Sequence, residues 1–182
     1  KDMRRKAKEV NFGVLYGMGA YGLSWRTGIS LGEAQEFIEK YFEAFDGVRD
    51  WIEGTLRHVR EEGFVETLLG RIRYLPEIHS GMAPVRKAAE RMAINAPIQG
   101  TAADLMKLAM IAVQAEIAKR YPAGEVKMVL QVHDELVFEV KKSLLAEVST
   151  WVKDIMENIY ELRVPIEVKV ETGRSWGETT EI

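Results

Sequence analysis

The sequence contains no cysteine and no run of about 18 apolar residues, and each absence excludes a class of structure. Without cysteine there are no disulfides and no thiolate metal sites, which leaves carboxylates as the plausible ligands for a hard, magnesium-like cation. Without a long apolar run, and with charged residues at its start, the sequence indicates neither a membrane span nor a signal peptide. A cytoplasmic location is therefore the default expectation.

The sequence also lacks a general excess of positive charge. Its formal net charge of −3 argues against a protein that binds DNA with its whole surface. The first eight residues nevertheless carry five cations against one acid. A second basic cluster consists of Arg71, Arg73, Arg86, Lys87 and Arg91. Local patches, not net charge, would therefore hold phosphates.

Hydrophobic content of 47% over 182 residues is enough for a core of ordinary size, in one domain or two small lobes. Helical periodicity predicts helices over residues 2–16, 31–45 and 48–62, the second opened by a capping box of Ser30 and Glu33. Residues 64–75 read as a short hairpin around Gly70, and Ser80 to Pro84 as a loop.

A further helical stretch runs from about 84 to 120, and Pro97 predicts a break or kink near 95–97 that separates two helices. Residues 127–132 and 135–140 are rich in strand-forming side chains, and only His133 and Asp134 separate them, so they predict a tight hairpin. A helix over 143–160 and a strand over 164–171 complete the chain. This order predicts an α+β fold whose antiparallel sheet has helices on one face.

Arg4, Lys8, Phe12 and Tyr16 are spaced four residues apart and form one slowly winding stripe on the first predicted helix. The stripe drifts by roughly 120° over about 18 Å, close to the length of a nucleoside triphosphate. Its cations suit phosphates, and its rings suit a base and a sugar. The alternative is an amphipathic helix with a solvated basic start. Cations near a helix N-terminus and Gly13 inside the helix are both unfavourable for stability, which weakens that alternative.

Two further groups of polar residues have both an ordinary and a functional interpretation. Asp134 and Glu135 lie at the predicted hairpin tip, where an ordinary solvated turn is the alternative to a metal site. Neighbouring strand residues point to opposite faces, so the two acids need not bind the same ion. Arg91, Asn95 and Gln99 form either a surface stripe or a set of donors across a DNA minor groove, where base acceptors are similar for every correct pair.

Four segments, in the same order along the chain, resemble the family A DNA polymerases of the DNA polymerase I type. The first runs from Arg4 to Gly17 and matches the nucleotide-binding helix of the fingers. The others are Gly63 to Arg71, Arg91 to Asp104, and Gln131 to Glu135. The resemblance covers essentially the whole chain, and its motifs are specific.

The resemblance implies roles for the residues of the first stripe. Arg4 and Lys8 would contact the triphosphate of a deoxynucleoside triphosphate, and Lys8 is also a candidate proton donor to departing pyrophosphate. Phe12 would pack against the incoming sugar, and Tyr16 against the templating position or the nascent pair. Arg5 lies about 100° around the helix from Arg4, so a phosphate role for Arg5 would need a bent or offset pose.

The resemblance also assigns the remaining site residues. Asp134 would be a direct magnesium ligand and Glu135 a weaker or water-mediated one, in a site that holds two Mg²⁺ ions when complete. Arg91, Asn95 and Gln99 would bind primer-template DNA, and His133 the primer terminus. Residues 1–94 would form a portion of the fingers and residues 95–182 a partial palm.

The family's other palm aspartate lies in an Asp-Tyr-Ser-x-x-Glu segment that precedes the finger helix, and this sequence has none. The resemblance therefore implies a fragment of a replication or repair polymerase, inactive alone, whose partners include the remaining palm and thumb. Its location would be the bacterial nucleoid or an equivalent. The alternatives are a noncatalytic nucleic-acid-binding module, which needs neither the triphosphate stripe nor Asp134, and a mere folding unit.

Overall fold

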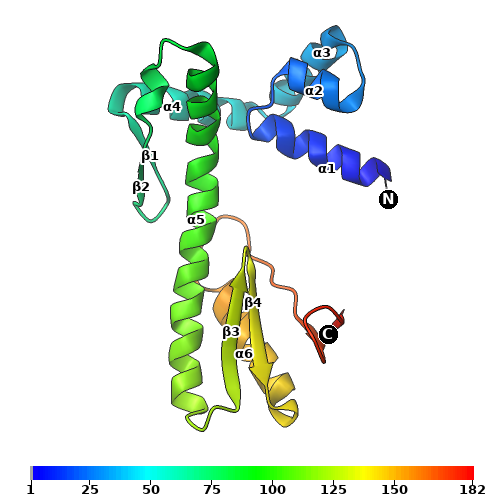
Figure 1. Ribbon diagram of the computed structural model, residues 1–182, viewed down its shortest axis with the longest axis vertical. Coiled ribbons are helices and arrows are strands. Elements are labelled where there is room, and N and C mark those ends of the chain that lie inside the picture. The colour runs from blue at the N-terminus through cyan, green and yellow to red at the C-terminus, as the bar shows by residue number, and fades with distance from the viewer. Residues whose placement is uncertain (1) are drawn as a thin grey trace. The chain divides into compact units, whose positions relative to one another are not determined.

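The computed structural model describes residues 2–182 (Figure 1). These residues form two compact units, one ending at Thr101 and the other beginning at Ala102. Both units contain helices and short antiparallel strands, so the predicted α+β class is confirmed. Each unit is described by itself below. Within residues 2–182, no helix is both long and apolar enough to span a bilayer.

The first unit begins with α1 (Asp2–Leu15), α2 (Ala20–Thr27), α3 (Leu31–Ala44) and α4 (Asp46–Glu62). The capping box predicted for α3 is present, because the Ser30 hydroxyl accepts from Glu33 N at 3.2 Å and Ser30 N donates to Glu33 Oε2 at 2.8 Å. Helix α2 was not predicted. It is only 8 residues long and buries only Leu23 among its side chains, which leaves too little periodic signal to detect.

The predicted hairpin around Gly70 is confirmed as β1 (Phe64–Glu66) paired with β2 (Ile72–Tyr74). A 3₁₀ helix, η1 (Pro76–His79), follows, and α5 (Ala83–Arg120) begins inside the segment predicted as the Ser80–Pro84 loop. Side chains from α4, β1, η1 and α5 form one core of this unit, with Val59, Val65, Ile78 and Ala93 buried. A separate core joins α1, α2 and α3 through Val14, Leu23 and Ala34.

The prediction that Pro97 divides this stretch into two helices is wrong, because α5 is continuous from Ala83 to Arg120. Proline removes one backbone donor and crowds the carbonyl four residues earlier, which weakens one turn. The good helix formers on both sides keep the rest of the ladder intact. The boundary between the two compact units also lies inside α5, at Thr101.

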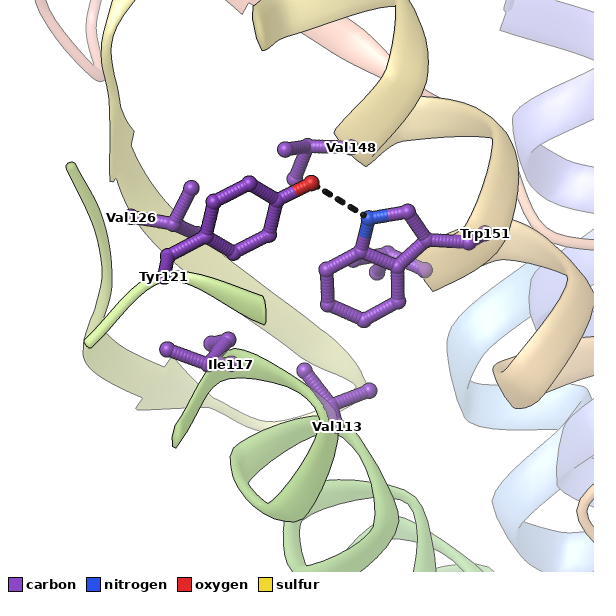
Figure 2. Close-up of a cluster of buried hydrophobic side chains, with 7 residues drawn as sticks. Val113, Ile117, Tyr121, Val126, Val148 and Trp151 are labelled. Carbon is purple, nitrogen blue, oxygen red and sulfur yellow. Dashed lines mark hydrogen bonds between the residues drawn. The ribbon is translucent and has the colours of Figure 1, made fainter. Parts of the chain in front are cut away.

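The second unit contains β3 (Val126–Val132), β4 (Glu135–Val140), the 3₁₀ turn η2 (Lys142–Leu144) and α6 (Leu145–Glu157). The predicted tight hairpin is confirmed: β3 and β4 pair antiparallel up to Val132 and Glu135, with an irregularity between Met128 and Leu130. Its core joins the C-terminal half of α5 to the hairpin and α6. It includes the buried residues Val113, Ile117, Val126 and Val148, and the ring pair Tyr121 and Trp151 (Figure 2).

The strand predicted over 164–171 is largely wrong, and the predicted single sheet is wrong as well. Residues 164–170 form no ladder, and the last strands are β5 (Glu171–Gly173) and β6 (Thr179–Glu181). The described residues contain three separate two-stranded sheets. A strand requires a neighbour for its backbone groups, and alternating side chains alone do not supply one. Val168 N donates instead to the Glu157 carboxylate at 2.9 Å.

Candidate functional site

Helix α1 buries one face and leaves the predicted stripe on its surface. Val14 is only 1% exposed, and Val10 packs against the same core. Arg4 and Lys8 are exposed, Phe12 is 41% exposed and Tyr16 is half-buried. Since core residues recur on the other side, the stripe is not needed for packing. The side chain of Arg5, the neighbour of Arg4 in the sequence, lies outside the described residues.

The middle and end of the stripe form a continuous surface of one cation and two rings. Lys8 Nζ lies 5.6 Å from the centroid of the Phe12 ring. The rings of Phe12 and Tyr16 have centroids 6.0 Å apart and planes inclined by 23°. An exposed cation–π contact is worth only about 0.5–1 kcal/mol, so a phosphate can draw the ammonium group away at small cost.

The end of α1 packs directly against α5, which the sequence did not predict. Gly17 has φ 82°, a conformation that favours glycine. A Cβ added to Gly17 would lie 3.4 Å from both Arg91 Cγ and Ile94 Cδ1. The stripe on α1 therefore ends beside Arg91, the first residue of the second candidate group. In the sequence, Gly17 signalled only the end of a helix.

On α5, Arg91 and Gln99 are exposed while Asn95 is half-buried. Asn95 Oδ1 is buried and has no hydrogen-bond partner among the described residues. A buried acceptor without a donor costs about 1–3 kcal/mol, so packing does not explain this amide. Ala93 and Ile94, on the inner face of the same turn, are buried in the ordinary way.

His133 and Asp134 form the turn between β3 and β4, and Glu135 begins β4. All three are exposed. His133 has φ 50°, a left-handed conformation in which histidine is enriched among non-glycine residues. The Gln131 side chain donates from Nε2 to the His133 carbonyl at 2.7 Å and so fixes the turn. The sequence did not predict a role for Gln131, because nothing in the residues around it indicates the hydrogen bond to the His133 carbonyl.

The carboxylates of Asp134 and Glu135 fit part of a magnesium site. No group of three or more His, Asp or Glu side chains that could hold a metal occurs among the residues whose side chains the structure describes. Magnesium is commonly held by one or two carboxylates, with water and substrate phosphates completing its six oxygen ligands. The donor set on this turn therefore suits such an ion only together with ligands from elsewhere.

The candidate residues belong to two separate groups. The first unit holds the stripe on α1 and the residues Arg91, Asn95 and Gln99 of α5, and Gly17 links the two sets. The second unit holds the β3–β4 turn.

Comparisons with known proteins agree on one family. The family model for DNA polymerase family A matches residues 1–178. The chain is 54% identical over 176 residues to the thermostable DNA polymerase I of Thermus filiformis, and 48% identical over 177 residues to DNA polymerase I of Pseudomonas aeruginosa. Each alignment covers 97% of this chain, but only 21% and 19% of those proteins. The chain thus spans about a fifth of the length of these relatives.

The chain is also similar to a solved structure of a polymerase domain. The chain is similar to the POL domain of Pol1 from M. smegmatis in complex with a DNA primer-template and dNTP, with a TM-score of 0.91 and 46% sequence identity. The match covers 97% of this chain and 31% of that one.

Proposed function

Because this chain belongs to DNA polymerase family A, we propose that it forms the nucleotide-binding helix and part of the palm of a template-directed DNA polymerase. In this proposal residues 1–94 are a portion of the fingers and residues 95–182 a partial palm. The polymerase would transfer nucleotides from deoxynucleoside triphosphates to a primer 3′-hydroxyl. The observation that carries the proposal is the stripe of exposed Lys8, exposed Phe12 and half-buried Tyr16, which lies on the side of α1 opposite its core residues.

In the proposed mechanism α1 binds the incoming nucleotide along its length. The guanidinium of Arg4 and the ammonium of Lys8 pair with the triphosphate oxygens, and Lys8 can donate a proton to departing pyrophosphate. Phe12 packs on the sugar one turn later, and Tyr16 lies against the templating position or the nascent pair. Positive charge and aromatic faces are thus ordered along the helix as phosphates, sugar and base are ordered along the nucleotide.

Primer-template DNA binds beside the far end of that stripe. Arg91 would pair with a backbone phosphate, and Asn95 and Gln99 would donate to minor-groove acceptors that all correct base pairs share. These contacts would sense the shape of a pair without reading its sequence. The relative from M. smegmatis was solved with both primer-template and dNTP, which supports the same two partners for this chain.

Asp134 and Glu135 would hold Mg²⁺, with Asp134 as the direct ligand and Glu135 as a weaker or water-mediated one. When bound, two such ions acidify the attacking hydroxyl and stabilise charge at the attacked phosphate. Gln131 keeps the turn in shape by its bond to the His133 carbonyl. His133 would contact the primer terminus. The remaining palm and thumb of the polymerase would supply the other ligands.

Calorimetric titration of dATP into this chain, with and without magnesium, tests the proposal. We expect binding that Lys8→Ala abolishes and that the control Lys40→Ala leaves unchanged, because Lys40 is an exposed lysine of α3 paired with Glu36. Equal binding by the wild type and Lys8→Ala would show that the phosphates do not lie on α1. Binding of primer-template DNA without any binding of dATP would instead support the noncatalytic nucleic-acid-binding module.

A further inference from the structure

The tip of the β1–β2 hairpin is attached to α5 by the hydroxyl of Thr101, one turn beyond Pro97. Leu68 N donates to Thr101 Oγ1 at 3.0 Å, and Thr101 Oγ1 donates to the Pro97 carbonyl at 2.6 Å. Thr101 is only 8% exposed. A single buried hydroxyl therefore joins a loop and a helix whose bonded groups lie 33 residues apart in the chain.

A second contact lies directly beside this hydroxyl. A Cβ added to Gly100 would lie 2.6 Å from Thr67 Cγ2, closer than two such carbons can approach. Thr67 is 7% exposed, and its Oγ1 accepts from Arg71 N at 3.1 Å within the hairpin loop. Thr67 is therefore fixed in place, and the hairpin fits against α5 only because residue 100 has no side chain.

The contacts of Thr101 and Gly100 lie close to the turn of α5 whose hydrogen bonding Pro97 weakens. Pro97 has no N–H, so the carbonyl of Ala93 lacks its helical donor and the turn around 93–97 is weakened. Asn95 lies inside that turn, and Gln99 follows it by two residues. The Thr101 hydroxyl ties the Pro97 carbonyl, at the end of the weakened turn, to the backbone of the hairpin.

We propose that Thr101 is a positioning residue: together with Gly100 and Thr67 it holds the Pro97 turn against the β1–β2 hairpin and so keeps Asn95 and Gln99 aligned for primer-template DNA. This role rests on the proposed function, because it acts through the DNA contacts assigned to those two side chains. Thr101 itself is too buried to reach DNA. Its effect should therefore appear in DNA affinity and not in nucleotide affinity.

The first test compares Thr101→Val with Thr101→Ser in the full-length polymerase that carries this chain. Valine keeps the shape of threonine but removes the hydroxyl, whereas serine retains it. We expect Thr101→Val to weaken primer-template binding about tenfold, the effect of one lost hydrogen bond. Affinity for dATP should change less than twofold, and Thr101→Ser should restore most of the DNA affinity.

The second test uses the close contact between Gly100 and Thr67. Gly100→Ala should weaken primer-template binding, because the new methyl collides with Thr67 Cγ2. Thr67→Ser removes that methyl and keeps the oxygen that Arg71 N requires, so the double variant should recover. Hydrogen exchange at the Leu68 amide, measured in every variant, reports independently whether the hairpin is still attached.

Two outcomes would overturn the positioning role. In the first, the Leu68 amide exchanges faster in Thr101→Val while primer-template affinity stays within twofold of the wild type. In the second, Thr67→Ser fails to rescue Gly100→Ala. The parallel variant Gln99→Ala separates this result from failure of the proposed function. If Gln99→Ala is silent, the DNA contact of Gln99 is absent. If it weakens binding and Thr101→Val does not, only the positioning role fails.

Discussion

Asn95 carries a polar group that the fold does not use. Its buried Oδ1 has no partner among the described residues, and it lies between the buried Ala93 and the exposed Gln99 on α5. Asn95→Ala should therefore leave the free energy of unfolding unchanged or higher by up to about 1 kcal/mol, since the unpaired acceptor is removed. The same change should weaken primer-template binding by about 1–3 kcal/mol.

Chemical denaturation and fluorescence anisotropy with labelled primer-template measure the two effects separately. Gln114→Ala is the matched control, because Gln114 is an exposed amide on the same helix to which we assign no role. A variant that loses stability while retaining DNA affinity would identify Asn95 as an ordinary structural residue. Equal losses for all base pairs are expected, because minor-groove acceptors are shared.

Asp134 is exposed at a turn, so its charge contributes little to the core. Asp134→Asn in the full-length polymerase should keep the turn but remove the charge that we propose binds the metal. The chemical step should then slow by several orders of magnitude, while thermal stability hardly changes. Single-turnover kinetics with saturating dNTP measure the step, and near-normal turnover would show that Asp134 is only a turn residue.

We expect Tyr121 to make the stability of the second unit depend on pH in the alkaline range. Its hydroxyl donates to Glu147 Oε1 at 2.7 Å. The same hydroxyl accepts from Trp151 Nε1 at 3.4 Å (Figure 2). Burial, with a smaller contribution from the bond to Glu147, raises the pKa of Tyr121 above its ordinary value of 10.0. The folded state thus holds this proton more tightly than the unfolded state, and stability falls as pH rises past the unfolded value.

The advantage of the wild type over Tyr121→Phe should therefore be complete below about pH 9 and should shrink as the pH rises above 10.0, the ordinary pKa of the unfolded tyrosine. Urea denaturation followed by circular dichroism at several pH values measures this difference. An unchanged difference between the wild type and Tyr121→Phe across this range would contradict the assignment.

Among the elements, α3 depends on its capping box. Ser30→Ala removes the acceptor for Glu33 N and should cost about 1 kcal/mol of stability at neutral pH. The hydrogen bonds with the Ser30 side chain and backbone lower the pKa of Glu33 below 4.5. Stabilisation from this carboxylate is present above that value and is lost as pH falls through the lowered pKa.

The stability difference between the wild type and Ser30→Ala should accordingly shrink as pH falls below 4.5. Thermal unfolding between about pH 3 and about pH 7 tests it. Ser149→Ala provides the control, because Ser149 is a half-buried serine inside α6 and not a cap. A pH-independent difference would mean that Glu33 does not close the box in solution.

Elements whose causes are local could be predicted from the sequence. The start of α3, the end of α4 at Gly63 and the two-residue turn of β3–β4 each depend on a few neighbouring residues. Two of the predictions were wrong because the structure there has non-local causes. Helix α5 continues through Pro97 because its flanking turns sustain it, and residues 164–169 form no strand because none of the described strands pairs with them.

In the candidate site, too, the features with a local cause could be predicted from the sequence, and those with a non-local cause could not. Spacing by four residues predicted the stripe on α1 and the set of Arg91, Asn95 and Gln99 on α5, because helical geometry brings residues at this spacing to one face. The contact of Gly17 with Arg91, the bond of Gln131 to His133 and the attachment of Leu68 to Thr101 were not predictable. Two of these contacts join segments that are distant in the sequence, and the third depends on the conformation of the β3–β4 turn. No pattern of residues in the sequence indicates them.

At the scale of the molecule, the two units carry different parts of the proposed function. The first unit contains the proposed nucleotide and DNA contacts and has two cores of its own, and the second unit contains Asp134 and Glu135 and a third core. A reaction assisted by two ions needs carboxylates from more than one strand around metals about 3.5–4 Å apart. Within the described residues, Asp134 and Glu135 on one turn belong to no group of three or more potential ligands.

We therefore expect the 182-residue chain alone to bind dATP but not to extend a primed template. The measurement is extension of a 5′-labelled primer under single-turnover conditions, with this chain in excess and magnesium present. The full-length polymerase is the positive control, and this chain with Asp134→Asn identifies contamination by a host polymerase. Extension that requires magnesium and disappears in Asp134→Asn would contradict the prediction, because a contaminant would be unaffected by that substitution. Such a result would mean that two carboxylates on one turn, with the phosphates of the substrate, are a sufficient set of protein ligands.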